Sequence, residues 1–218
     1  MKAGATSGFI VAVCGSRVLP AGLRPQVERV TAYLLDAGAG LAVGCCVGVD
    51  ECVIQASARF GWSRTTVWSA FGPVSPVLAP PPRHYMAAGA WSGSALAAVA
   101  EHRQRGGLVM PWAGGGPDVP LKARLAQRTR TVIADATASA VVLFSSPRSH
   151  GSALACRLAL ARGLPVFAFP LGFSGSLLPA LGPGAWRSIT GPGCWAQAWR
   201  WFPAQVFHPA CNPVEVIP

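Results

Sequence analysis

The stretch that decides the fold is FIVAVCGSR, residues 9–17. Its first part, 9–14, is a continuous run of apolar, mostly β-prone residues, as in a strand that is buried on both faces of a parallel sheet. Gly15, Ser16 and Arg17 follow as a turn. From Pro25 to Asp36 the apolar residues then recur at helical spacing. The order of strand, glycine turn and helix predicts the start of an α/β fold.

The same alternation continues along the chain. Strands are expected at 41–45, 65–70, 107–110, 138–144 and 165–169, and helices at 49–60, 94–105, 121–135 and 151–162. Residues 71–83 are rich in proline and are expected to form a loop. This pattern predicts an α/β, Rossmann-like fold with a mostly parallel, doubly wound sheet and helices on both faces.

The alternating pattern ends near Pro170. We expect a Rossmann-like domain over 1–171 and a tail over 172–218 that is rich in Trp, Gly and Pro and packs on the domain. The tail contains Trp186, Trp195, Trp199 and Trp201. These side chains either stack on nucleic-acid bases beside Arg187 and Arg200, or cover an edge of the core or an interface. The second interpretation is favoured.

The composition indicates a compact and strongly basic protein. Of its 218 residues, 51% are hydrophobic and 12% are charged, which argues against disorder, and the net charge is +10. Most of the basic residues are arginines, which bind phosphate through a planar fork. A basic surface favours polyanions. A GC-rich codon bias also enriches arginine, but it does not remove Asp and Glu and so explains the net charge less well.

No apolar run reaches the length of a membrane span, and the run 9–14 leads straight into a glycine turn, which is not typical of a signal peptide. The seven cysteines have irregular spacing and no CxxC pair. This predicts neither a structural metal site nor a disulfide, and no cofactor is expected. A reducing cytoplasm is the expected location, without a membrane partner.

Three turns follow predicted strands and precede predicted helices, where sheets of this kind bind ligands. The first is Gly15–Ser16–Arg17, and the second runs from Gly44 through Gly48 to Asp50. Each glycine alone could serve packing only, and Asp50 could cap a helix rather than bind a ribose. Neither GxxxxGK nor GxGxxG is present.

The third turn, SSPRSHGS at 145–152, places Ser149, Gly151 and Ser152 where a helix begins. The free amides and the dipole of a helix N-terminus attract anions. We therefore expect the three turns to converge in one cleft that binds phosphate.

Five segments, taken in order, resemble the DprA/Smf proteins, which handle single-stranded DNA in natural transformation. They are VAVCGSR (11–17), GCCVGVDECVIQAS (44–57), TTVWSAFG (65–72), LAQRTRTVIADATASAVVLF (125–144) and SHGSALACRLALARGLPVFAFP (149–170). They are similar to that family's "GSR", "SGxAxGID", "TIAVLG", "FPxRNRIIAGLSDAVVVVEA" and "SGSLITAxxAxxxGRxVFAVPG" segments. The wider SLOG superfamily also contains LOG-like nucleotide hydrolases and ligand-sensing domains.

The resemblance implies that Arg128 and Arg130, in a basic cluster with Lys122 and Arg124, lie beside the nucleotide pocket; the alternative is a solvated helix face. The candidate phosphate- or nucleotide-binding residues are Gly15, Ser16, Arg17, Gly44, Gly48, Asp50, Arg128, Arg130, Ser149, Gly151 and Ser152. No catalytic residue is predicted.

Two departures from the family patterns bear on chemistry. Ser145 stands where the family has an acidic residue, and Thr129 stands in place of the asparagine of "RNR". The LOG-type "PGGxGTxxE" is absent, and no Glu follows Gly151 in the next predicted helix. The carboxylate expected for hydrolysis of a glycosidic bond is therefore missing.

The favoured function is a DprA-like protein that binds nucleic acid, with single-stranded DNA preferred, in a basic cleft and without chemistry of its own. The alternative is a SLOG-type domain that senses a free or cyclic nucleotide. A LOG-like phosphoribohydrolase is the least favoured, so whether the chain is an enzyme stays open. Self-association or a protein partner also stays open.

Overall fold

β1 (Ile10–Gly15) lies inside an eight-stranded sheet in the computed structural model, which describes residues 8–72 and 93–204. Its neighbours, β2 (Gly40–Val43) and β5 (Ser139–Phe144), are both parallel to it. Because strands flank it on both sides and helices cover both faces, the apolar run is buried throughout its middle. The expected α/β, Rossmann-like fold is confirmed.

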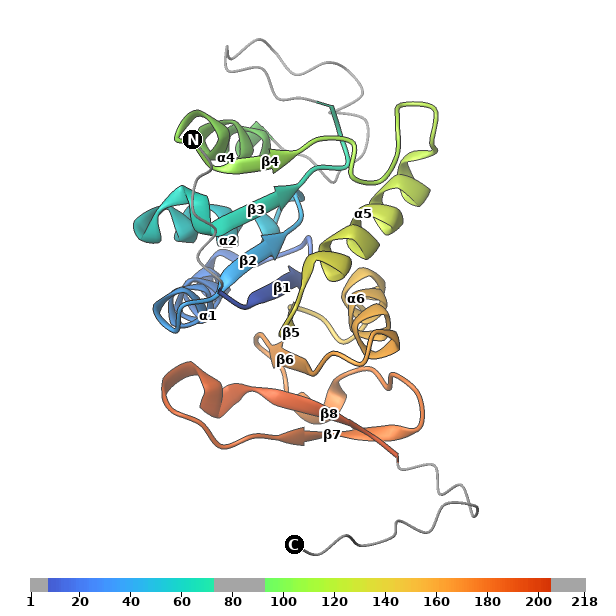
Figure 1. The fold of residues 1–218 in the computed structure, drawn as a ribbon. Helices are drawn as coiled ribbons and strands as arrows, with labels where there is room; N and C mark the ends of the chain where they lie inside the picture. The colour runs from blue at the N-terminus through green and yellow to red at the C-terminus, as the bar shows by residue number, and fades with distance from the viewer. Residues whose placement is uncertain (1–7, 73–92, 205–218) are drawn as a thin grey trace, which may run out of the picture.

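Parallel pairing continues outward in both directions from this centre. β3 (Thr65–Trp68) and β4 (Leu108–Met110) follow β2, and β6 (Val166–Pro170) follows β5. The strand order is β4-β3-β2-β1-β5-β6-β8-β7, so the order reverses at β1 (Figure 1). In open α/β sheets, ligands bind at such a reversal, outside the carboxyl ends of the strands.

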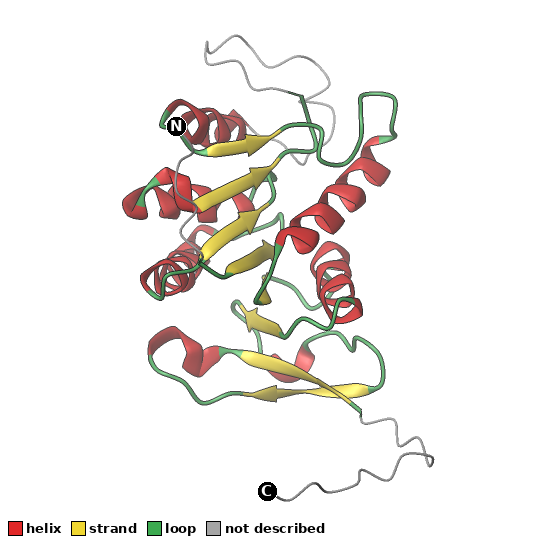
Figure 2. Ribbon diagram, viewed as in Figure 1, coloured by secondary structure: helices red, strands yellow, loops and turns green. Residues whose placement is uncertain are grey.

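Helices cover both faces of the sheet. α1 (Arg24–Asp36), α2 (Val49–Ser57) and α4 (Gly93–Gln104) lie on one face, and α5 (Leu121–Asp135) and α6 (His150–Ala161) lie on the other (Figure 2). The buried residues form two apolar clusters, one beneath each helical layer. Within the residues described, no helix combines the length and hydrophobicity that a membrane span requires.

The boundaries differ from the prediction by a few residues. The helix expected at 49–60 ends at Ser57 and continues as the short 3₁₀ helix Ala58–Phe60. The strand expected at 41–45 ends at Val43, which is the last residue of β2 that pairs with β1 and β3. Most of the expected loop at 71–83 lies outside the described residues.

The sequence pattern predicts no strand after Pro170, whereas the structure has two. β8 (Trp199–Pro203) pairs antiparallel with β6, and β7 (Gly184–Ser188) pairs antiparallel with β8 at the edge of the sheet. The alternation of apolar and polar residues that identifies a strand is absent here, because large aromatic residues occupy both faces of this hairpin. The division of the chain at residue 171 stays a prediction.

The tail tryptophans pack against the sheet. Trp201 is 5% exposed, and its ring contacts that of Trp186 edge-on with the centroids 5.3 Å apart. Trp195 packs against Phe167 and Phe169 on the other face. These rings close the edges of the two apolar clusters and are not presented as a stacking surface.

Leu35→Ala is expected to lower the free energy of unfolding by about 2–5 kcal/mol, because Leu35 is fully buried on α1 and the truncation leaves a cavity. Leu177→Ala is the control: its side chain is 58% exposed, so the change should stay within about 0.5 kcal/mol. Urea unfolding followed by circular dichroism measures both. Equal small losses would contradict the packing of α1 on the sheet.

Candidate functional site

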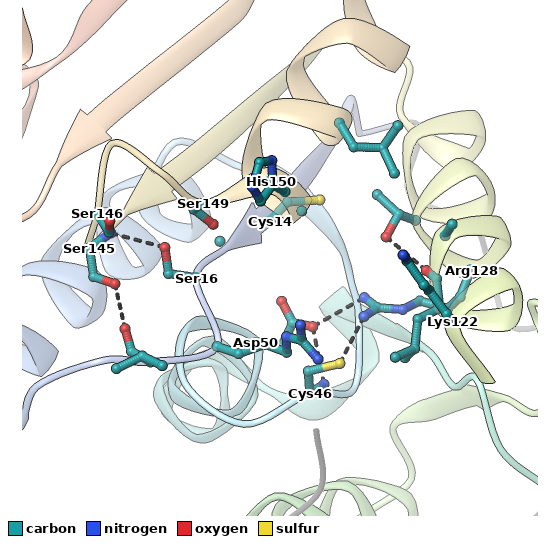
Figure 3. A pocket seen from close by; sticks show the side chains of 18 of the residues that line it. Cys14, Ser16, Cys46, Asp50, Lys122, Arg128, Ser145, Ser146, Ser149 and His150 are labelled. Carbon is teal, nitrogen blue, oxygen red and sulfur yellow. Dashed lines mark hydrogen bonds and ion pairs between the residues drawn. The ribbon is translucent and has the colours of Figure 1, made fainter. Parts of the chain in front are cut away.

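A pocket of about 680 Å³ opens at the carboxyl ends of β1 and β5 (Figure 3). The first turn lines it with residues 14–18, the second turn with Cys46 and Asp50, and the third with Ser145, Ser146 and residues 148–151. α5 adds Leu121, Lys122, Leu125, Ala126, Arg128 and Thr129, and α6 adds Leu154. The volume is within the range of roughly 300–1,000 Å³ that is typical of small-ligand sites.

Ser16 ties the first and third turns together. Its amide donates to the carbonyl of Leu143 at 3.1 Å, and its Oγ accepts from the amide of Ser145 at 3.0 Å. The Ser145 hydroxyl donates in return to the carbonyl of Val18. Ser145, which replaces the acidic residue of the resembled family, therefore closes the turns on each other and leaves no charge there.

Gly48 lets the second turn pack directly on the first. Its φ is +86°, and a Cβ there would lie 2.5 Å from the carbonyl oxygens of Ser16 and Arg17. The following amide, that of Val49, donates to the carbonyl of Ser16 at 3.1 Å. Gly48 thus fixes the position of the first turn, but it does not line the pocket itself.

A buried ion pair forms one wall of the pocket. Arg128 Nη1 donates to Asp50 Oδ2 at 3.1 Å, and the same oxygen accepts from the amide of Cys46 at 3.1 Å. Arg128 Nη2 contacts Cys46 Sγ at 3.0 Å. Gly44 allows this arrangement, since a Cβ there would lie 1.4 Å from Arg128 Nη1.

Electrostatics in this wall favour a fixed cation. Burial raises the pKa of Asp50, and the facing Arg128 opposes that rise. Burial alone would lower the pKa of Arg128, but the negative charge of Asp50 opposes this effect, and the pKa is raised. Arg128 Nε is buried without a hydrogen-bond partner among the described residues. One donor of a permanently charged group on the pocket wall is therefore unused.

The helix N-terminus that faces the pocket is that of α6. Ser149 is its N-cap residue, but the Ser149 side chain accepts no bond from the helix amides, and its Oγ pairs instead with that of Ser152 at 2.7 Å. Amides in the first turn of a helix have no partner within the helix and attract anions. In α2, by contrast, the amides of Val49 and Glu51 already donate to the carbonyls of Ser16 and Cys46.

Three exposed cations surround the opening: Arg17, Lys122 and Arg148. Between described residues the one ion pair is that of Asp50 with Arg128, so none of the three has a carboxylate partner there. Asp50 is also the one carboxylate in the part of the lining that the structure describes. The pocket therefore suits an anion.

The cysteines in the lining are neutral thiols. Burial raises the pKa of Cys14 to about 12, and the hydrogen bond with Cys45 together with burial raises that of Cys46 well above its usual value. The thiolate is the nucleophilic form of cysteine, so neither side chain is poised to attack a substrate. No group of three or more His, Cys, Asp or Glu side chains in the described ranges is placed to hold a metal ion.

Most of the predicted residues meet here, but four do not line the pocket: Gly44, Gly48, Arg130 and Ser152. Arg130 is exposed and donates to Gln127 at 3.0 Å. It follows Arg128 by two positions, which is about 200° around a helix, so the two side chains point to opposite sides of α5.

Arg124 also leaves the expected basic cluster. It is buried, donates to the carbonyls of Val119 and Ala70, and lies over the rings of Phe71 and Trp112. Its role is to pack the loops beneath α5. The four basic residues therefore divide among the pocket wall, its rim, the core and solvent.

Several lining residues were outside the predicted set. Ser145, Ser146, Arg148 and His150 belong to the third turn, and the small polar character of the whole turn was the available signal. Leu121, Leu125 and Leu154 add apolar surface to the lining. They carry no distinguishing signal, because apolar residues at helical spacing are typical of a core.

Fold and site together define a Rossmann-like protein with a pocket lined by cations at the point where the strand order reverses. DNA processing protein A (DprA) from Helicobacter pylori, studied for its single-stranded DNA binding mode, matches with a TM-score of 0.56 and 19% identity over 76% of this chain and 67% of that one. DprA from Streptococcus pneumoniae matches with a TM-score of 0.55 and 21% identity over 78% of this chain.

The fold is accordingly DprA-like, as the resemblance implied. The chain spans 53% of the S. pneumoniae protein, about half its length. No protein-family model matches the sequence, and no curated protein sequence does.

Gly48→Ala is expected to destabilise the protein more than Gly61→Ala. Both glycines have a φ near +90°, +86° and +91°, so each alanine incurs a backbone strain of about 1–3 kcal/mol. A Cβ at position 61 meets no atom within 4 Å, whereas one at 48 meets backbone. Thermal unfolding measures the difference, and equal losses would contradict the close approach of the first two turns.

Asp50→Ala is expected to cost about 3–5 kcal/mol of stability, because it leaves Arg128 buried and unpaired. In the double variant Asp50→Ala, Arg128→Met no charge is left unpaired, so it should regain much of that loss. Denaturant unfolding of four proteins, the wild type, the two single variants and the double variant, measures this. A double variant as unstable as the sum of both single changes would mean that the ion pair is not coupled.

Proposed function

We propose that this protein binds single-stranded DNA and holds its phosphates in the pocket between β1, β5, α5 and α6. The observation that carries the proposal is that one pocket combines an open helix N-terminus with three exposed cations that lack carboxylate partners among the described residues. A net charge of +10 adds long-range attraction for a polyanion.

A phosphate at the start of α6 would accept hydrogen bonds from the amides of the first helical turn and from the hydroxyls of Ser146 and Ser149. Arg17 and Arg148 would approach it from the rim as charged forks, and Lys122 would face it from α5. Arg128 would add its fixed positive charge from the pocket wall, although its guanidinium is already engaged by Asp50.

The lining of the pocket favours an unpaired strand over a duplex. It combines polar groups with apolar surface from Leu121, Leu125 and Leu154. A base could lie against these leucines only if it is not paired. Similarity of fold to the H. pylori DprA, whose structure addresses single-stranded DNA binding, supports the same ligand class.

A free or cyclic nucleotide is the second candidate, favoured by the volume of about 680 Å³, which suits a ligand of that size. Hydrolysis of such a ligand is not supported, because the carboxylate of Asp50 is buried and engaged by Arg128 and by the amide of Cys46. The two ligand classes differ in how affinity depends on strand length.

Arg17→Ala is expected to weaken binding of labelled single-stranded DNA about tenfold or more, because a charge-assisted contact contributes roughly 1.5–3 kcal/mol and 1.4 kcal/mol is a factor of ten. Each lost phosphate contact should also lower the salt slope on single strands by about 0.7. Fluorescence anisotropy at two salt concentrations, with single-stranded DNA, duplex DNA and a panel of nucleotides, measures both effects.

Arg105→Ala is the control, since Arg105 is exposed and outside the pocket. Arg64 is unsuitable because its guanidinium donates to the carbonyls of Leu35 and Ala39. Equal effects of Arg17→Ala and Arg105→Ala would reject the pocket. Affinity that is the same for a mononucleotide and a longer strand would favour the nucleotide-sensing alternative.

A further inference from the structure

The β7–β8 hairpin has two faces of different chemistry. Trp186, Trp199 and Trp201 pack on the apolar cluster that α6 covers. The opposite face brings together Phe167 of β6, Arg200 and Phe202 of β8, and Arg187 of β7; these four residues are named the arginine–aromatic face. In the register of the strands, Arg200 lies directly between Phe167 and Arg187.

The charged groups of this face lie over its rings. Arg187 Cζ is 5.2 Å from the centroid of the Phe202 ring, and Arg200 Cζ is 5.1 Å from the same centroid and 5.8 Å from that of Phe167. Both arginines are exposed and both phenylalanines are half-buried. Cation–π contacts therefore hold two guanidinium groups at the surface of the sheet.

These two charges are not neutralised within the described protein. Arg187 and Arg200 are direct cross-strand partners, an arrangement that is unfavourable for like charges. No carboxylate pairs with either one among the described residues. In the sequence, moreover, no Asp or Glu occurs between Asp135 and Glu215. An anionic ligand would relieve this repulsion.

We propose that the arginine–aromatic face is a second contact for single-stranded DNA, on which unpaired bases stack while the two arginines neutralise phosphates. Aromatic rings and guanidinium planes are the surfaces on which unpaired bases stack, and stacking tolerates any sequence. The inference rests on the proposed function, because it takes the same ligand class.

The face is separate from the pocket. Phe167 packs against Trp195, which contacts Tyr33 of α1, so the arginine–aromatic face lies on the α1 side of the sheet. The pocket is lined instead by α5, α6 and the turns. In Figure 1 the hairpin extends the sheet beyond β6, at the edge opposite β4. Substitutions on the face should therefore leave the pocket intact.

The test compares the double variant Arg187→Ala, Arg200→Ala with Arg59→Ala, Arg105→Ala, which removes the same charge from exposed positions outside both surfaces. The probes are oligo-dT of about 20 nucleotides, longer than one site of roughly 4–16 nucleotides, an abasic strand of the same length, and dT of about three nucleotides. Anisotropy at two salt concentrations gives the affinities.

Loss of both arginines should weaken binding of the long dT strand about tenfold or more and change binding of the short one less than twofold. It should also remove most of the preference of the protein for dT over the abasic strand, because that preference depends on stacking. The variant Arg187→Lys, Arg200→Lys keeps the charge and most of the salt slope. The preference of this lysine variant for dT should lie between that of the wild type and that of the alanine variant. Ammonium groups do not stack on bases, but the lysines still neutralise phosphates.

The proposal is overturned if the alanine variant and the charge-matched control lose affinity equally for every probe, which would mean that only net charge matters. It is also overturned if the alanine variant binds all probes normally but changes its oligomeric state in light scattering, because the face would then bind protein. Wild type that binds no strand at all would reject the proposed function. Wild type whose binding depends on Arg17 alone would reject only this inference.

Discussion

The ion pair between Asp50 and Arg128 connects the two helical layers at the carboxyl end of the sheet. Asp50 belongs to the first turn of α2, and Arg128 to the middle of α5, on the opposite face. Removing two charges from water is costly, so such a pair persists only where further hydrogen bonds satisfy it. The amide of Cys46 provides one of these, and it also fixes the second turn against the pair.

The rest of the pocket is built outward from this pair. The second turn supports the first through Gly48 and the bond from Val49 to Ser16, and the first supports the third through the bond from Ser145 to Ser16. The second turn thus holds the first in place, and the first holds the third. The helix N-terminus of α6, which none of these bonds occupies, is left facing the cavity.

The fold could be predicted wherever the burial of an element produces a recognisable pattern of apolar and polar residues in the sequence. The run 9–14 is apolar throughout because β1 is covered on both faces, so its place inside the sheet could be anticipated. β8 could not, because Trp199 and Trp201 face one apolar cluster while Phe202 lies with arginines on the other face. Aromatic residues on both faces obscure the period of two that identifies a strand.

The site could be predicted where the signal is a backbone requirement and not where it depends on side-chain direction. Glycine turns after strands located the pocket, since close approach of backbones leaves no room for a Cβ. Arginine residues, in contrast, have different roles that the sequence does not distinguish. Arg124 and Arg162 donate to carbonyls of the protein itself, Arg128 forms a buried ion pair, and Arg17 is exposed at the pocket.

These different roles of the arginines limit how much of the net charge can contact a ligand directly. A guanidinium that donates to buried carbonyls still contributes to the long-range field, but its donors are already used and cannot reach a phosphate. Under the proposed function, contact with a ligand is therefore left to arginines that no described carboxylate or carbonyl engages. At the pocket these are Arg17 and Arg148, and on the hairpin they are Arg187 and Arg200. The charge of +10 attracts a polyanion from any direction, whereas the two proposals assign close contact to these four side chains.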